Sequence, residues 1–373
     1  MLFALSKLDA KEIQVIERIE ETRQNLKYIL STPARWSGNL RRSTFARAIR
    51  GSNSIEGINV SEEDAIAAVQ GEEPSEATKL DWAAVVCYRT AMTYVLQLAS
   101  DPYFSYSEGF IRSLHYMMVQ YDLTKNPGRW RPGAISVRDE QKNEIVYRAP
   151  DAEEVPKLMG ELIGELRQQA NDTPVIIRAA MGHLNLDMIH PFSDGNGRMA
   201  RCLQTLILSR EGILEAPFCS IEEYLGRNTQ DYYNVLAEVG KGSWNPSNET
   251  KPWIRFCLTA HFRQATTLLR RSKEIKALWD QLEIEIKRRY LPNRFIFALA
   301  DAAMGLKVRN STYRSSADVT GFVASRDLLQ LARSGFLVPS GEKRGRYYVA
   351  SEVIKAIREQ VREPGTSNED PFA

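Results

Sequence analysis

The fold of this chain is decided by the stretch Ile189-His190-Pro191-Phe192-Ser193-Asp194-Gly195-Asn196-Gly197-Arg198-Met199-Ala200-Arg201. Apolar residues recur at helical spacing before it, over 176–189, and after it, over 199–208. We therefore predict a polar loop between two buried helices. The second helix is expected to begin near Asn196, because the glycines on either side permit a tight turn and asparagine is a favoured N-cap.

The same residues supply the parts of a phosphoryl-type transfer site. Free backbone N–H groups at a helix N-terminus attract an anion, and glycines let a phosphate approach the backbone. Asp194 is a hard oxygen ligand suited to Mg²⁺, and His190 can take a proton from a hydroxyl. Arg198 and Arg201 share a helix face and suit a polyphosphate. Each residue alone would also fit a capped loop with a buried histidine and solvated arginines. The prediction of a transfer site therefore rests on finding all of them within a dozen positions.

This stretch resembles the signature of the Fic (Fic/Doc) family, H-P-F-x-D-G-N-G-R-x-x-R, and departs from it nowhere. The resemblance implies a mainly α-helical Fic core and transfer of a nucleoside monophosphate, usually AMP from ATP, to a protein hydroxyl. It also implies Mg²⁺ as cofactor. The roles carried over are general base (His190), Mg²⁺ ligand (Asp194), α- and β-phosphate binding (Gly195, Asn196, Gly197), outer-phosphate binding (Arg198, Arg201) and core anchor (Phe192).

A second motif lies upstream, at the end of a helix predicted over about 41–57. Ser52-Asn53-Ser54-Ile55-Glu56-Gly57 matches the inhibitory motif [S/T]-x-x-x-E-[G/N] of Fic proteins. In the family this glutamate pairs with the second signature arginine, here Arg201. An arginine engaged by a carboxylate cannot also bind the γ-phosphate, so the resemblance implies autoinhibition by Glu56, with Ser52 and Gly57 completing the motif. Without that context, Glu56 and Gly57 would read as an ordinary helix end.

Over residues 128–150 the sequence pattern predicts a β-hairpin instead of a helix. Ile135-Ser136-Val137 and Ile145-Val146-Tyr147 alternate like two short strands around the polar turn 139–143. Their position resembles the Fic flap, which holds the modifiable segment of the target protein, and an exposed strand edge can pair with an extended peptide. The alternative is a hairpin with no such role.

The remaining segments are predicted to be helical up to the C-terminal part. Over 220–239, Asn228 and Tyr232 lie four residues apart, and the resemblance implies that this helix closes the adenosine pocket; packing is the equal alternative. His115 and His183 are expected to be structural. The predicted domains are a helical region (1–99), a Fic core (100–271), a connector helix (272–289), a winged-helix-like domain (290–362) and a disordered tail (363–373).

The winged-helix expectation rests on predicted helices followed by a hairpin tipped with Lys343, Arg344 and Arg346. Such a wing can contact phosphates, so DNA is a possible partner of this domain, with protein binding as the alternative. The whole chain of 373 residues has 49 Lys and Arg against 47 Asp and Glu. This net charge of +2 is too small to attract nucleic acid or a membrane surface by itself.

The N-terminus is soon charged and no segment is long and apolar enough for a membrane span, so neither a signal peptide nor a membrane partner is expected. The four cysteines lie far apart without a CxxC pair, which favours reduced thiols and a cytoplasmic location.

We therefore expect a protein adenylyltransferase that uses Mg·ATP, acts on a target protein or on itself, and can form a homodimer. Three alternatives stay open. They are removal of AMP with Glu56 orienting a water, transfer of another nucleotide or phosphate moiety, and a DNA-binding regulator whose Fic core senses nucleotide.

Overall fold

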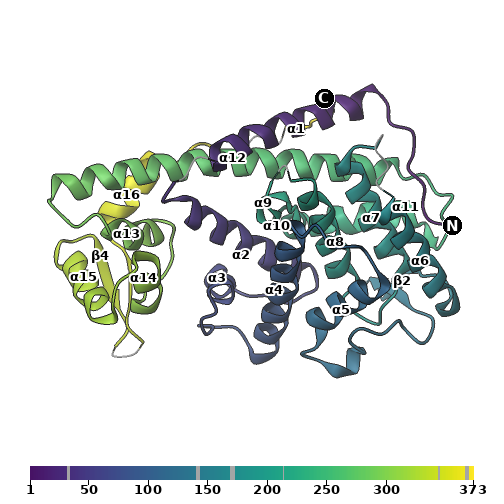
Figure 1. The fold of residues 1–373 in the computed structure, drawn as a ribbon, viewed down its shortest axis with the longest axis horizontal. Helices are drawn as coiled ribbons and strands as arrows, with labels where there is room; N and C mark the ends of the chain where they lie inside the picture. Colours follow the sequence, from purple (N-terminus) through teal and green to yellow (C-terminus); the bar gives the residue numbers. More distant parts are fainter. Residues whose placement is uncertain (32–33, 140–142, 169–172, 213, 343–344, 366–368) are drawn as a thin grey trace. The chain divides into compact units, whose positions relative to one another are not determined.

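The computed structural model describes the chain except for residues 32–33, 140–142, 169–172, 213, 343–344 and 366–368 (Figure 1). The chain divides into two compact units. Unit 1 comprises 1–28, 43–266 and 368–373, and unit 2 comprises 29–42 and 267–367. The division falls within α1 (Ala10–Ser31), α2 (Ser37–Ile55) and α12 (Lys251–Arg288). No helix of the described residues is long and apolar enough to cross a membrane.

Unit 1 is built around α7 (Val175–Ile189) and α8 (Asn196–Arg210), which pack along each other as predicted. Nearly every side chain of both helices is buried, including apolar residues on all sides, and such helices belong at the centre of a core. This unit also contains further helices and two short 3-10 turns. They are α3 (Glu62–Gln70), α4 (Lys79–Ala99), α5 (Glu108–Val119), η1 (Leu123–Lys125), η2 (Ala152–Glu154), α6 (Val155–Arg167), α9 (Ala216–Cys219), α10 (Glu222–Arg227) and α11 (Thr229–Gly240).

The predicted hairpin is present as β1 (Ser136–Asp139) and β2 (Glu144–Arg148), which pair antiparallel with a bulge between Val137 and Arg138. A third strand, β3 (Gly242–Ser243), pairs parallel to β2 and was not predicted, because two residues carry no periodicity. On its other side β1 meets no strand among the described residues. Part of the predicted turn, residues 140–142, lies outside the described residues.

Unit 2 contains the predicted helices and hairpin in the predicted order, which is the basis of the winged-helix expectation. A buried carboxylate connects the three helices: Asp327 accepts hydrogen bonds from Arg294 Nε (2.6 Å) and Nη2 (2.9 Å), and from the Tyr313 hydroxyl (3.0 Å). The elements are α13 (Phe295–Ala303), α14 (Asn310–Ala317), α15 (Gly321–Arg333), β4 (Leu337–Ser340), β5 (Tyr347–Ala350) and an unpredicted α16 (Glu352–Gln360). Lys343 and Arg344 of the predicted basic wing lie outside the described residues.

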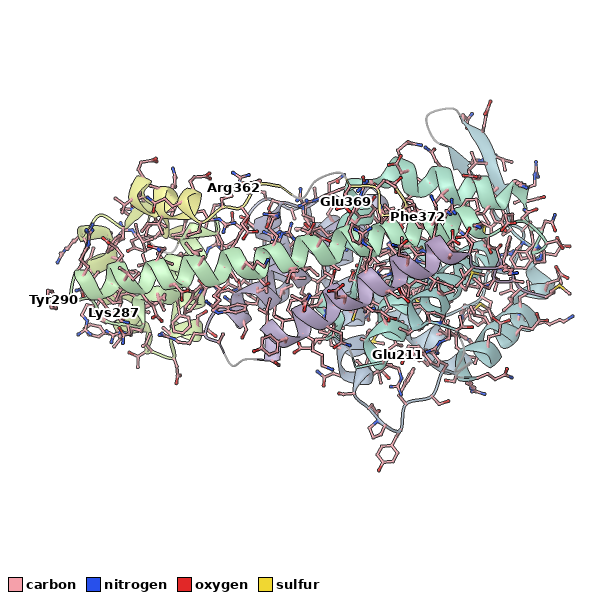
Figure 2. All side chains as sticks on the ribbon, turned by 90° about the horizontal axis from the view of Figure 1, so that it is seen from above. Glu211, Lys287, Tyr290, Arg362, Glu369 and Phe372 are labelled. Carbon is pink, nitrogen blue, oxygen red and sulfur yellow. The ribbon has the colours of Figure 1, made fainter. Side chains whose placement is uncertain are left out.

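The structure differs from the sequence expectations at three places. The connector is not a separate helix, since α12 continues without a break over 251–288. The segment 220–239 is two helices, because α10 ends and α11 begins at Asn228. Within the expected tail, residues 369–373 make side-chain contacts, and residues 366–368 lie outside the described residues. Glu369 pairs with Arg18 at 2.6 Å, and the Arg255 guanidinium carbon lies 5.1 Å from the centroid of the Phe372 ring; Figure 2 labels Glu369 and Phe372.

Candidate active site

The signature loop begins with an unusual backbone turn at His190. This residue caps α7 in the left-handed conformation, with φ at 51° and its N–H donating to the Leu186 carbonyl at 3.1 Å. Its Nδ1 lies 3.0 Å from the carbonyl oxygen of Asp187, which can only accept, so Nδ1 carries the proton. In the neutral ring Nε2 is therefore the unprotonated nitrogen, as a general base requires.

Asn196 closes the loop rather than capping the next helix. Its side-chain oxygen accepts from the Phe192 N–H and its amide donates to the Phe192 carbonyl, both at 2.9 Å. The N-cap of α8 is Gly195, with φ at 79°, which corrects the expected cap by one residue. The Phe192 ring is buried and stacks on the His115 imidazole at 3.7 Å, consistent with the predicted anchor.

Two residues outside the signature hold this loop in place. His115 accepts a hydrogen bond from the Gly128 N–H at Nδ1 and donates from Nε2 to the Asp194 carbonyl, both at 2.9 Å. Burial lowers the pKa of His115 to about 4, so the ring stays neutral and keeps this tautomer. Arg131, a buried residue to which no sequence pattern pointed, donates to the carbonyls of His190 (2.8 Å), Gly133 (2.7 Å) and Pro150. It thus joins the signature loop to the segments flanking the hairpin.

The N-terminus of α8 is lined by two buried guanidinium groups, and both side chains are about 1% exposed. Arg198 Nη2 lies 3.8 Å from Asp194 Oδ1. Within the described residues, Nε and Nη1 of Arg198 and Nη1 of Arg201 have no hydrogen-bond partner. Buried donors normally have partners, so these atoms and the positive end of the helix together have the chemistry that an anion requires.

Glu56 occupies part of that site. Its Oε1 accepts from Arg201 Nη2 at 2.7 Å, and a Cβ on Gly197 would lie only 2.7 Å from the same oxygen. The carboxylate oxygen therefore stands where a phosphate oxygen could approach the glycine backbone and the guanidinium. Burial by itself would lower the pKa of Arg201, but Glu56 holds it above its usual range.

Helix α2, which ends one residue before Glu56, is fixed by close packing. Ser52, fully buried, accepts from Arg201 through its hydroxyl (2.8 Å) and its carbonyl (3.0 Å). Gly51 meets Gly226 of α10 so closely that a Cβ on Gly226 would lie 2.6 Å from Gly51 Cα. At the end of the helix Gly57 adopts a φ of 74°, as a left-handed cap. The Tyr233 hydroxyl donates to the Ile55 carbonyl at 2.8 Å, a contact the sequence did not indicate.

The residues predicted for the adenosine pocket make internal contacts. Tyr232 is 1% exposed, its hydroxyl bonds His183 Nε2 at 2.9 Å, and its ring lies 6.0 Å from the Arg201 guanidinium carbon. Tyr232 therefore supports Arg201 from the core, which corrects the expected nucleotide contact. Asn228 donates to the Tyr224 carbonyl at 2.8 Å between α10 and α11, and its nucleotide contact stays a prediction.

The predicted docking residues on the hairpin fall into two groups. Tyr147 is a buried anchor, because its hydroxyl donates to the Met188 carbonyl at 2.9 Å and its ring packs on Gly240. The other five are exposed or half-buried and stay docking predictions: Ile135, Ser136, Val137, Ile145 and Val146.

Glu222 adds a buried carboxyl, on a residue whose backbone packs against Gly51 of α2. It is 1% exposed, and burial raises its pKa from 4.5 to about 7, against the opposing charge of Arg201. Between these two values the folded protein binds one more proton than the unfolded chain. The contribution of this group to the free energy of unfolding should therefore be fully present below about pH 4.5. It should be lost as the pH rises towards 7.

Replacing Glu222 by glutamine should remove that contribution. We expect the difference in melting temperature between pH 5 and pH 8 to be smaller in Glu222→Gln than in the wild type, measured by thermal unfolding across that range. An exposed glutamate, Glu76→Gln, is the matched control and should behave like the wild type. Identical pH profiles in all three proteins would contradict a raised pKa at Glu222.

The fold and site together define a helical protein in which His190, two buried arginines and the carboxylates of Asp194 and Glu56 lie around the N-terminus of one helix. Residues 105–208 match the model of the Fic/DOC family. The chain therefore contains a Fic domain over these residues, and the named relatives and solved structures that it resembles are Fic proteins.

Individual relatives agree with this assignment. The chain is 28% identical over 264 residues to the protein adenylyltransferase Fic of Nematostella vectensis, which covers 68% of this chain and 55% of that protein. It is 31% identical over 97 residues to a probable protein adenylyltransferase of Aquifex aeolicus, covering 26% and 28% of the two chains. The chain thus spans about half, or less, of the length of these curated relatives. A crystal structure of a Fic family protein from Desulfovibrio desulfuricans shares the fold, with a TM-score of 0.59, 21% identity and coverage of 93% and 98%.

Proposed function

We propose that this protein is a protein adenylyltransferase that moves AMP from Mg·ATP to a side-chain hydroxyl of Ser, Thr or Tyr in a target protein, and that Glu56 inhibits it. The observation that carries the proposal is the anion site at the start of α8, where Glu56 now fills the place of a phosphate oxygen. The names of the relatives, protein adenylyltransferases, support the same reaction.

In the proposed reaction, each group of the site has a separate role. The target hydroxyl oxygen attacks the α-phosphorus of ATP, a new P–O bond forms, and the bond to the β-phosphate oxygen breaks with its electron pair on diphosphate. His190 Nε2 takes the hydroxyl proton. Arg198 and Arg201, already desolvated, stabilise the charge that develops on the leaving diphosphate. The free edge of β1 offers main-chain groups to an extended target segment.

Asp194 fits the Mg²⁺ that this reaction implies. Burial alone would raise the pKa of this carboxyl, but Lys125 and Arg198 hold it below its usual range, so it is an anionic oxygen ligand at neutral pH. The side chain is 33% exposed, and a single carboxylate completed by phosphate oxygens and water is an ordinary Mg²⁺ site. Bound there, the ion would neutralise charge on the phosphates and orient them.

Loss of this ligand should lower activity. We expect Asp194→Ala to transfer AMP more slowly than the wild type, and excess EDTA to slow the wild type as well, measured by label transfer from ATP. Adding Mg²⁺ back should restore the AMP-transfer rate of the EDTA-treated wild type, but it should not raise the rate of Asp194→Ala. A wild-type rate that is indifferent to EDTA would remove the metal from the mechanism.

Two positions of radiolabel test the function itself. The Glu56→Gly protein is incubated with cell lysate and ATP labelled at the α- or the γ-phosphate. Compared with the lysate alone, we expect added labelled protein bands only from α-labelled ATP, and release of free AMP from them by mild phosphodiester cleavage. Labelling from the γ-position would indicate phosphate transfer, and no labelling from either would contradict a transferase. A homodimer and DNA contact through residues 290–362 stay predictions that this reaction does not require.

A further inference from the structure

We propose that Lys125 fills the cation position beside Asp194 in the resting protein, so that a divalent cation binds there only after the ammonium group has left. This inference rests on the proposed function, because it concerns the metal of that reaction. It makes Lys125 a positioning residue that sets the metal requirement of the site.

The contact itself is short and specific. Lys125 Nζ lies 2.5 Å from Asp194 Oδ2, whereas the other carboxylate oxygen accepts the Gly195 N–H at 2.5 Å and faces Arg198. The ammonium group thus holds the oxygen that the signature loop leaves free. An ammonium and a metal ion at the same oxygen would repel each other at contact distance, so the two occupants compete. Both side chains are about one-third exposed, which leaves a path for hydrated ions.

The position of Lys125 is fixed by its own backbone. It ends the 3-10 turn η1, which Asp122 caps through the Thr124 N–H at 3.0 Å and which Asn126 ends with a φ of 50°. Gly128, three residues on, is held by His115, and the same imidazole holds the carbonyl of Asp194. One neutral ring therefore sets the distance between the segment that carries the lysine and the loop that carries the aspartate.

The structure also provides a second partner for the displaced ammonium. Nζ donates to the Tyr121 hydroxyl at 3.0 Å, and this contact does not involve Asp194. Since an ammonium has three donors, leaving the carboxylate does not strand it without a partner. In the resting site, side chains of the protein itself therefore pair with both charged groups. Glu56 pairs with Arg201 where an anion would bind, and Lys125 pairs with Asp194 where a cation would bind.

Binding of Mn²⁺ alone to the full chain, followed by the electron paramagnetic resonance signal of the free ion, tests this competition. We expect Lys125→Met and Lys125→Gln to bind Mn²⁺ ~3- to 10-fold more tightly than the wild type, as for removal of one partly exposed ion pair. Lys125→Arg, which keeps the charge, should stay near the wild type. Lys157→Met, at an exposed lysine of α6, is the matched control and should not change the affinity.

The gain must depend on Asp194. Adding Asp194→Asn to Lys125→Met should abolish the tighter binding, and survival of that binding would place the ion elsewhere and overturn the proposal. Neutral variants of Lys125 that bind Mn²⁺ no more tightly than the wild type would overturn it as well. Neither result depends on AMP transfer, so failure of the proposed reaction and failure of this inference are distinguishable.

Discussion

His190→Ala is expected to lower the rate of AMP transfer by ~10²–10⁴-fold, the usual contribution of a general base. ATP binding should remain largely intact, because the groups proposed to hold the phosphates are Arg198, Arg201 and the backbone at the start of α8. The unprotonated Nε2, set by the hydrogen bond from Nδ1 to the Asp187 carbonyl, is the group that the variant lacks.

Two measurements separate chemistry from binding in this variant. Calorimetry gives the ATP affinity, and initial-rate transfer from α-labelled ATP gives the activity. Lys157→Ala serves as an exposed control that should match the wild type in both. An alanine variant with near-wild-type activity would mean that His190 is not the base.

Glu56→Gly is expected to raise the initial rate of labelling by ~10- to 100-fold, because a charge-assisted hydrogen bond is worth ~1.5–3 kcal/mol and each 1.4 kcal/mol is tenfold. The variant frees Arg201 Nη2 and clears the space above Gly197, where a phosphate oxygen is proposed to bind. Glu56 is one-quarter exposed, so thermal stability should change little.

A graded series makes this prediction specific. Glu56→Asp, one methylene shorter, should fall between the wild type and Glu56→Gly. Arg201→Ala should not activate, because it removes a phosphate ligand together with the restraint. Glu76→Gly, at an exposed glutamate between α3 and α4, should label like the wild type. If Glu56→Gly labels no faster than the wild type at one ATP concentration, Glu56 does not inhibit the transfer and only follows the end of α2.

The centre of the fold was predictable from sequence because its signal is local. Apolar periodicity on either side of 189–201 indicated α7 and α8, and the glycines marked the loop between them. The close approach of Glu56 to Arg201, by contrast, was expected only from the resemblance to a family, since nothing in the periodicity relates residues 145 positions apart.

The contacts that the sequence did not indicate are those made by unremarkable residues across long separations. Lys125 is one lysine of many, and its approach to Asp194 depends on the turn at η1 and on His115. Tyr232 satisfied the helical spacing for a pocket residue, but spacing does not distinguish a face that points into the core from one that lines a site. Tyr232 is buried and its hydroxyl bonds His183, a partner 49 positions away that no local pattern encodes.

The left-handed backbone at position 190 also has a consequence for a saturation library there. With φ at 51°, side chains other than glycine, asparagine and aspartate carry a conformational penalty of ~1–2 kcal/mol. Screening the library for soluble yield should enrich those three residues, whereas screening it for labelling should recover histidine alone. The two selections should then favour different residues at a single codon, because the backbone conformation and the proposed proton transfer place different demands on this position.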